Sequence, residues 1–252
     1  MKVVVATGDE LDSSRPGAWS KIVVLRQLLA KDTFDWLVFM DMDAFVMNPS
    51  IKLEWLIEGS GGKDILMTED WNGANTGVFL VRNSRWSRWL LDEWWKQDQF
   101  ISGDFPFEYE QRGLHFLLQT DAWTGWRPAM PAYPDGDAAA VRAHFRFLPQ
   151  CAMNSYLVHP FQAARKASVR RWGHRGTYRP GDFVLHLAGK KGRARQRLAE
   201  HFAAVAAAAL GEEAERVAAS VDGGSGSGGA SGAGAGGGAG GDAIPGPEGA
   251  DG

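Results

Sequence analysis

The sequence has few of the features that mark several large classes of protein. It holds a single cysteine, Cys151, so no disulfide can form within the chain, and we expect this thiol to be buried as a small apolar side chain. No apolar run approaches the roughly 18 residues that a membrane-spanning helix needs, and the N-terminus has no signal-peptide pattern. The sequence therefore predicts contact with a membrane only through an anchor that it does not itself include.

Positive and negative charges are nearly balanced. Lysine and arginine number 27 and aspartate and glutamate 30, which leaves a formal net charge of −3. Dense basic runs are absent, because the basic residues between Arg165 and Arg197 are scattered. Since binding to a nucleic acid backbone depends on clustered positive charge, we expect no nucleic-acid partner.

The apolar and aromatic content is that of a folded protein, except at the C-terminal end. Hydrophobic residues make up 44% of the 252 residues, enough for one sizeable core. Residues 222–252 consist mostly of glycine, alanine and serine and have almost nothing apolar to bury. We therefore predict one folded domain over residues 1–221 and a disordered tail over residues 222–252.

Periodic apolar residues predict an alternation of strands and helices. The expected strands cover residues 2–7, 35–40, 64–69, 77–82, 144–149 and 182–189. The expected helices cover residues 17–31 and 49–58, a segment that begins near Ser84, and residues 108–119 and 193–221. This order predicts an α/β fold with a mixed, mainly parallel, Rossmann-like sheet flanked by helices.

Two carboxylates follow the expected strand at residues 35–40. Asp41 and Asp43 would point to the same side of an extended chain, about 6.6 Å apart along it, at the strand end where α/β sheets bind ligands. In the ordinary alternative, one aspartate would cap a turn and the other would be exposed to solvent. The neighbouring residues are apolar, however, and unpaired carboxylates would be costly among them. The pair therefore predicts a site for a hard divalent cation such as Mn²⁺ or Mg²⁺.

His186 lies in the apolar run at residues 182–189, and Lys190 and Lys191 follow it. A lone histidine in such a run is ordinarily a hydrogen-bonded core residue, and the lysines alone would suit a solvated turn. Beside an acidic strand end, the imidazole would instead complete an oxygen-rich Mn²⁺ site. The two ammonium groups would then lie close to a diphosphate leaving group.

Two further polar segments are candidates for ligand binding. Asp70, Trp71, Asn72, Asn75 and Thr76 predict a polar loop with one aromatic side chain, which suits hydroxyl-rich ligands such as sugars, although turn geometry alone would also use such residues. The second segment begins the helix at residues 108–119 with Glu110 and Gln111. An acidic residue there is also a common partner of the helix dipole.

These segments together resemble the family 34 glycosyltransferases, the GT-A-fold enzymes that include fungal galactosyl- and mannosyltransferases and plant xyloglucan xylosyltransferases. The resemblance extends over about residues 19–197 in the order of the family. It is carried by "WSKIVVLRQLL", "FDWLVFMDMDAFVMNPSIKLE", "DILMTEDWNGANTGVFLVRNSRWSRWLLDEWW", "EYEQRGLHFLLQ", "LPQCAMNSY" and "GDFVLHLAGKKG".

The resemblance implies a GT-A-like fold and a role for each matching position. It implies metal ligands, usually for Mn²⁺, at Asp41, Asp43 and His186. It implies contacts to a nucleotide sugar at Asp41, Lys21, Asn75 and Lys191. It implies catalytic positions beside the transferred sugar at Asp70, Glu110 and Gln111.

The implied function is a metal-dependent retaining transfer of galactose, xylose or mannose to a glycan or polysaccharide acceptor. The implied donor is a nucleoside-diphosphate sugar, a UDP-sugar first and GDP-mannose second, and the implied location is the lumenal face of the Golgi membrane. Family members normally have another βα unit before "WSK" and a membrane anchor upstream of it. We therefore expect a truncated chain in which residues 2–7 are a shortened first strand or the second strand with the first missing.

Two other functions stay open at this point. The haloacid-dehalogenase-like phosphatases also have an apolar strand that ends in two such aspartates, but they expect a small or β-branched polar residue where Phe45 stands. The other alternative is a truncated relative that folds and binds a partner or glycan without catalysis.

Overall fold

The computed structural model describes residues 12–70, 73–101, 109–118, 141–157 and 176–223. The chain divides into two compact units, Met1–Ala214 and Glu215–Gly252, and the second contains only the end of one described helix. The strand expected at residues 2–7 and the tail expected from residue 222, apart from that helix end, lie outside the described residues. Within the described residues, no helix has the length and apolar character needed to cross a membrane.

Among the described residues, four strands form the larger sheet, in the order β1-β4-β3-β5. These strands are β1 (Trp36–Met40), β3 (Ile65–Asp70), β4 (Gly73–Arg82) and β5 (Phe145–Leu148). Strand β4 runs antiparallel to both β1 and β3, and only β3 and β5 are parallel. The prediction of a mainly parallel sheet is therefore wrong. Only residues 71 and 72 separate β3 from β4, and a parallel pair needs a crossover of a dozen residues or more.

A smaller sheet has the order β2-β7-β6. It consists of β2 (Ala44–Val46), β6 (Ser155–Tyr156) and β7 (Val184–His186). Strand β7 is antiparallel to β2 and parallel to β6, and it is shorter than the strand expected at residues 182–189. Because β1 ends at Met40 and β2 begins at Ala44, the segment between them connects the two sheets.

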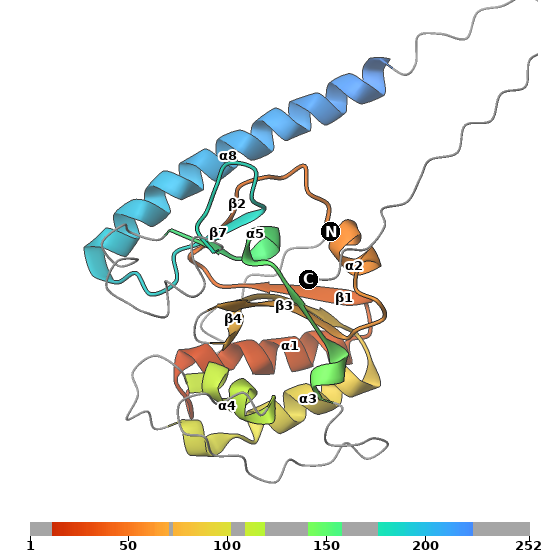
Figure 1. The fold of residues 1–252 in the computed structure, drawn as a ribbon, viewed down its shortest axis with the longest axis vertical. Coiled ribbons are helices and arrows are strands. Elements are labelled where there is room, and N and C mark those ends of the chain that lie inside the picture. Colours follow the sequence, from red (N-terminus) through yellow and green to blue (C-terminus); the bar gives the residue numbers. More distant parts are fainter. Residues whose placement is uncertain (1–11, 71–72, 102–108, 119–140, 158–175, 224–252) are drawn as a thin grey trace, which may run out of the picture. The chain divides into compact units, whose positions relative to one another are not determined.

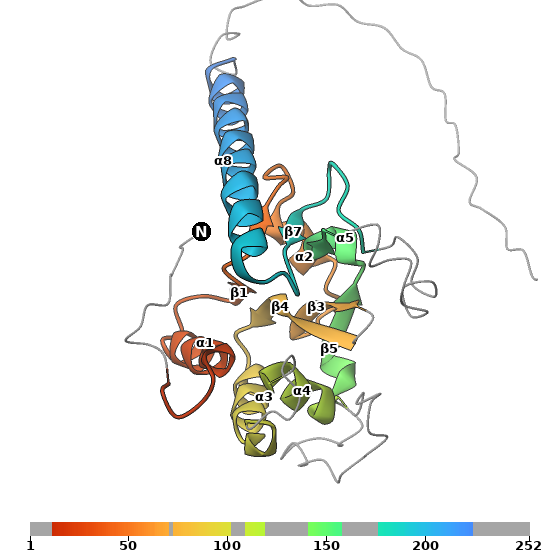
Figure 2. The ribbon, with the colours of Figure 1, turned by 90° about the vertical axis from the view of Figure 1, so that its left-hand side faces the viewer.

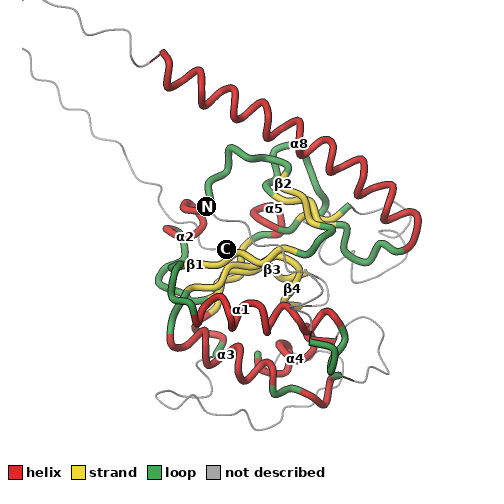
Figure 3. The backbone as a smooth tube through the Cα atoms, turned by 180° about the vertical axis from the view of Figure 1, so that it is seen from behind, coloured by secondary structure: helices red, strands yellow, loops and turns green. Residues whose placement is uncertain are grey.

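Helices cover one face of the larger sheet, as Figures 1 and 3 show. They are α1 (Ser20–Ala30), which follows the 3₁₀ turn Gly17–Trp19, α3 (Arg85–Trp95) and α4 (Tyr109–Leu117). Their buried faces carry Ile22, Leu25, Leu29, Trp86, Leu90, Trp94, Leu114 and Leu117, which confirms the helical spacing of these residues. The hydroxyl of Ser84 accepts a hydrogen bond from the backbone N–H of Ser87, so α3 starts where the sequence predicts.

The opposite face of the sheet contributes Leu66 and Leu80 to a second apolar cluster, which also includes Met153 and Val184. Figure 2 shows α2 (Leu53–Glu58) and α5 (Gln150–Met153) on this side. Helix α2 starts at Leu53, later than the helix expected from Pro49. The side chain of Asn48 accepts hydrogen bonds from the backbone N–H and the hydroxyl of Ser50, which holds a turn before the helix.

The single cysteine lies on the short helix α5. Cys151 is exposed, which contradicts the prediction of a buried thiol. Met153 is fully buried, and residues two apart on a helix point to different sides, so Met153 takes the buried position of this turn. The last helix, α8 (Gly192–Gly223), matches the helix expected at residues 193–221.

Candidate active site

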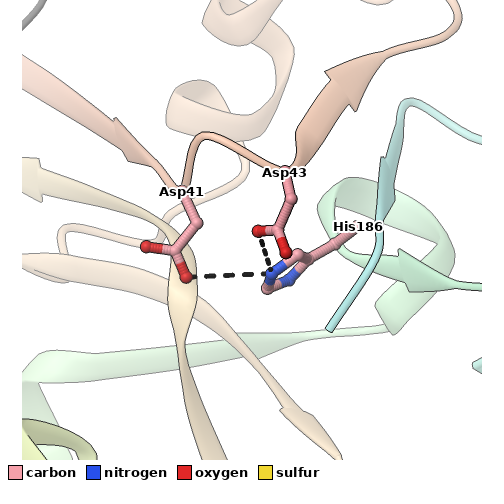
Figure 4. Close-up of side chains that lie close together, drawn as sticks. All are labelled: Asp41, Asp43 and His186. Carbon is pink, nitrogen blue, oxygen red and sulfur yellow. Dashed lines mark ion pairs between the residues drawn. The ribbon is translucent and has the colours of Figure 1, made fainter. Parts of the chain in front are cut away.

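The two aspartates lie in the link between the sheets, and His186 of β7 lies beside them (Figure 4). Nε2 of His186 lies 3.3 Å from Oδ1 of Asp43 and 3.7 Å from Oδ2 of Asp41. One ligand atom from each of the three residues lies within 4.8 Å of the others, so the group could hold a metal ion. The sequence predicted this grouping across more than a hundred residues of chain, and the structure brings it together.

Backbone hydrogen bonds fix the positions of both carboxylates. The N–H of Asp41 donates to the carbonyl of Gly77 at 2.7 Å, and the N–H of Ala44 donates to the carbonyl of Asp41 at 3.0 Å. The first bond continues the pairing of β1 with β4, and the second closes a turn. The pairing of β2 with β7 places Ala44 opposite His186, so the preceding residue, Asp43, lies beside the imidazole.

The pKa values of the two carboxyl groups are shifted in opposite directions. Burial raises the pKa of the Asp41 carboxyl, and the ammonium of Lys21 offsets only part of that rise. The pKa of Asp43 is lowered, chiefly by its hydrogen bond with His186. Carboxylate oxygens with one imidazole nitrogen are a donor set that suits Mn²⁺, and a cation would compensate the charge that burial disfavours at Asp41. The residues present therefore fit a divalent metal.

We call Asp41, Asp43 and His186 together the acidic group. Lys21 connects the acidic group to helix α4. Its buried Nζ lies 2.8 Å from Oε1 of Glu110 and 3.4 Å from Oδ1 of Asp41, and it donates to the carbonyl of Thr76 at 3.0 Å. Burial alone would lower the pKa of Lys21, but the two carboxylates outweigh burial and the net pKa is raised. The side chain is therefore a cation shared between the acidic group and Glu110.

Glu110 and Gln111 both reach strand β4 at Thr76. The hydroxyl of Thr76 donates to Oε1 of Glu110 at 2.9 Å, and its backbone N–H donates to Oε1 of Gln111 at 3.4 Å. The indole N–H of Trp94 donates to the carbonyl of Glu110 at 2.6 Å, which anchors the start of α4. The helix start thus faces the sheet, and Glu110 shares the ammonium of Lys21 with Asp41.

Asp70 and Asn75 lie on paired strands, not in a loop as the sequence predicted. Asp70 ends β3, and Asn75 and Thr76 belong to β4, whereas Trp71 and Asn72 lie outside the described residues. The polar composition suggested a loop, but the side chains of Asp70, Asn75 and Thr76 are buried. Nδ2 of Asn75 donates to Oδ2 of Asp70 at 3.2 Å.

The hydroxyl of Tyr156 donates to the same oxygen of Asp70 at 2.6 Å. Burial, together with the charge of Asp70, raises the pKa of Tyr156 well above its ordinary value. The phenol therefore stays protonated and keeps its role as a donor. The rings of Tyr156 and His186 also form a T-shaped pair, with centroids 5.7 Å apart, so Tyr156 links Asp70 to the acidic group.

Lys191 is exposed in the segment between β7 and α8, and its expected contact with a diphosphate stays a prediction. One helical turn later, Nη1 of Arg195 lies 3.8 Å from Oδ2 of Asp43. The sequence analysis gave no role to Arg195, although its position four residues after Lys191 on an expected helix could have suggested one.

Asn154 and Tyr156 also received no individual role from the sequence. Both lie in "LPQCAMNSY", which was assigned only as a matching segment. Oδ1 of Asn154 lies 2.9 Å from Nδ1 of His186, the ring nitrogen that does not face the aspartates. Asn154 is buried and Tyr156 is half-buried, and the sequence held no signal for them beyond the matching segment itself.

Comparison with known proteins identifies the family of the chain. The model of the galactosyl transferase GMA12/MNN10 family matches residues 56–196. The probable alpha-1,6-mannosyltransferase MNN10 of Saccharomyces cerevisiae is 24% identical over 200 residues, which are 68% of this chain and 46% of that protein. Xyloglucan 6-xylosyltransferase 1 of Arabidopsis thaliana is 35% identical over 92 residues, which are 33% of this chain and 20% of the relative. The chain thus spans less than half the length of either relative.

Solved structures give a weaker likeness. A glycosyltransferase involved in the glycosylation of the major capsid of PBCV-1 matches with a TM-score of 0.45 and 15% identity, over 74% of this chain and 75% of that one. The family model is the stronger finding, because it covers more than half of the 252 residues. The chain belongs to the galactosyl transferase GMA12/MNN10 family, glycosyltransferase family 34.

Proposed function

We propose that this protein is a metal-dependent retaining glycosyltransferase that moves a hexose or pentose from a nucleoside-diphosphate sugar to a glycan acceptor. The observation that carries the proposal is the convergence of Asp41, Asp43 and His186, with Lys21 as a bridge to Glu110. Membership in a glycosyltransferase family supports the same reading and argues against the phosphatase alternative.

Asp41, Asp43 and His186 would hold the divalent cation, with Mn²⁺ as our first choice and Mg²⁺ as the second. When bound, such a cation would neutralise the diphosphate of the donor and stabilise the charge on the leaving group. Lys191 and Arg195 flank the start of α8, and we assign them to the same diphosphate. Both side chains are exposed, so an anion at the metal could reach them.

Glu110 is best suited to electrostatic stabilisation. It accepts hydrogen bonds from Lys21 and Thr76 in a buried setting, so the orientation of its carboxylate is fixed. A carboxylate held in this way can stabilise positive charge that develops at the anomeric carbon of the sugar, with the amide of Gln111 beside it. We assign these two residues to the reacting face of the transferred sugar.

Asp70 and Asn75 are assigned to the hydroxyl groups of the sugar. Tyr156 and Asn75 both donate to Oδ2 of Asp70, so the carboxylate is fixed in one orientation. Fixed carboxylates and amides are the groups that bind hydroxyls with specificity, because a mismatched ligand leaves them unpaired. Lys21 is held by the carbonyl of Thr76 and the carboxylate of Asp41, and we assign it to the nucleotide end of the same site.

The donor is proposed to be a UDP-sugar, with GDP-mannose as the second choice, and the acceptor a glycan or polysaccharide. The two curated relatives are named for the transfer of mannose and of xylose, so their names do not select one sugar. By family resemblance we place the reaction at the lumenal face of the Golgi membrane.

The test is an assay for nucleotide release and sugar transfer with Mn²⁺. UDP-galactose, UDP-xylose, UDP-glucose and GDP-mannose would be offered with oligosaccharide acceptors, and product linkage would be read by NMR. We expect one donor to be consumed with the anomeric configuration kept, and Asp43→Ala to abolish the reaction. Asp35→Ala is the matched control, because Asp35 is exposed before the start of the same strand. Binding of donor without turnover by the wild-type chain would instead support the non-catalytic alternative.

A further inference from the structure

A buried hydrogen-bond network surrounds Asn154 beneath the acidic group. The side chain is fully buried, and its amide contacts three polar groups. Nδ2 donates to Oγ1 of Thr68 at 3.0 Å and to Oδ1 of Asn75 at 2.9 Å. Oδ1 lies 2.9 Å from Nδ1 of His186. Both ends of the amide are therefore used.

The direction of these bonds follows from a single backbone group. The N–H of Gly77 can only donate, and it points to Oδ1 of Asn75 at 2.9 Å. This oxygen accepts, so the group of Asn154 that faces it must be the NH₂. The carbonyl oxygen of Asn154 then faces His186 and has to accept a hydrogen from Nδ1.

This chain of bonds determines what His186 presents to the aspartates. With a proton fixed on Nδ1, the neutral imidazole has its lone pair on Nε2, the nitrogen that lies near Asp41 and Asp43. The opposite tautomer would set a lone pair of Nδ1 against the carbonyl of Asn154 in a buried place, which is costly. With Nδ1 held by Asn154, Nε2 is the nitrogen that donates to Asp43 when the ring is charged and that can bind an ion through its lone pair when the ring is neutral.

We propose that Asn154 is a positioning residue that fixes the tautomer and ring orientation of His186 for metal binding, with the direction of the network set at Gly77. The inference rests on the proposed function, because it concerns the same metal site. It assigns to Asn154 the role of outer partner to a metal-binding imidazole, and such partners change metal affinity about 10- to 100-fold when they are replaced.

The first test measures Mn²⁺ affinity from the EPR signal of free Mn²⁺, without nucleotide. Asn154→Ala is expected to weaken binding about 10- to 100-fold. Asn154→Asp keeps an acceptor for Nδ1 of His186 but loses the two donated bonds, so positioning predicts tighter binding than in the alanine variant. Thr68→Val is the matched control, because it removes one bond of the same amide and leaves the contact with His186 in place.

A purely structural role predicts the opposite order. The variant Asn154→Asp would then bind Mn²⁺ more weakly than Asn154→Ala, since it adds a buried charge beside Oδ1 of Asn75 and loses the same two bonds. Wild-type affinity in Asn154→Ala, or binding no tighter in Asn154→Asp than in Asn154→Ala, would overturn the proposal. Thermal unfolding of each variant would be followed in parallel.

The second test needs no variant. Long-range ¹H–¹⁵N spectra of the metal-free wild-type protein report which nitrogen of the neutral imidazole of His186 carries the proton. We expect the proton on Nδ1, and a proton on Nε2 would overturn the proposal even if the variants fail to fold. Because this measurement involves neither donor nor turnover, it separates failure of the positioning role from failure of the transferase function.

Discussion

Gly77 lies directly against the imidazole of His186. A Cβ added at residue 77 would stand 2.2 Å from Cε1 and 2.9 Å from Nδ1 of His186, closer than carbon and nitrogen atoms can approach. The absence of a side chain at this position in β4 therefore gives the imidazole its place beside Asp41 and Asp43.

Gly77→Ala is expected to displace His186 and to weaken Mn²⁺ binding about tenfold or more, the size of effect seen when the support of a metal ligand is lost. Gly17→Ala is the matched control, because a Cβ at residue 17 would meet no atom within 4 Å. Isothermal titration with Mn²⁺ would check the prediction. Equal affinities in the two variants would show that His186 does not need this space.

Opposite effects on stability are expected from Asp41→Asn and Asp43→Asn in metal-free protein. The pKa of Asp41 is raised in the folded protein. The stability that this carboxyl contributes is therefore present below its unfolded-state pKa of about 3.9 and is lost as the pH rises through its folded-state pKa. The pKa of Asp43 is lowered in the folded protein. The stability that this carboxyl contributes is therefore present above the unfolded-state pKa and is lost as the pH falls through its folded-state pKa.

At pH 7 we therefore expect Asp41→Asn to raise the midpoint of urea unfolding and Asp43→Asn to lower it. The loss in Asp43→Asn should shrink when the pH falls below the folded pKa of Asp43. Unfolding in EDTA at several pH values would check both signs. A shift in the same direction for both variants at pH 7 would contradict the unequal charge balance of this site.

Tyr156→Phe removes the hydroxyl that donates to Asp70. The lost hydrogen bond to a buried carboxylate should cost about 1.5–3 kcal/mol of unfolding free energy. Because Asp70 would be less well fixed, we also expect a higher KM for the nucleotide sugar. Tyr178→Phe makes the same change at a less buried tyrosine and should leave both values near those of the wild type. An unchanged stability and KM in Tyr156→Phe would remove Tyr156 from the site.

The sequence predicted most of the elements, because apolar spacing reports which face of a segment is buried. It did not predict the direction of strand pairing. Residues 64–69 and 77–82 were identified as strands, but their periodicity is the same in parallel and antiparallel sheets. The polar residues between them hid the fact that both strands extend to Asp70 and Gly73, which leaves room only for a hairpin.

The sequence also predicted the three residues of the acidic group. Asp41, Asp43 and His186 are polar residues among apolar neighbours, and the resemblance to family 34 implied that the three act together. Asn154 was not found, because its importance depends on which atoms of a buried amide face Asn75 and His186. Such contacts come from tertiary packing and leave no periodic pattern in the sequence.

The central claim is that this chain binds a nucleotide through a metal held by Asp41, Asp43 and His186. The most direct test is a titration with UDP, with and without Mn²⁺, followed by the fluorescence of the 11 tryptophans. We predict saturable binding only with Mn²⁺, its loss in Asp43→Ala, and its retention in Asp35→Ala. Binding of UDP that is equally strong without metal, or no binding of UDP or GDP at all, would contradict the account.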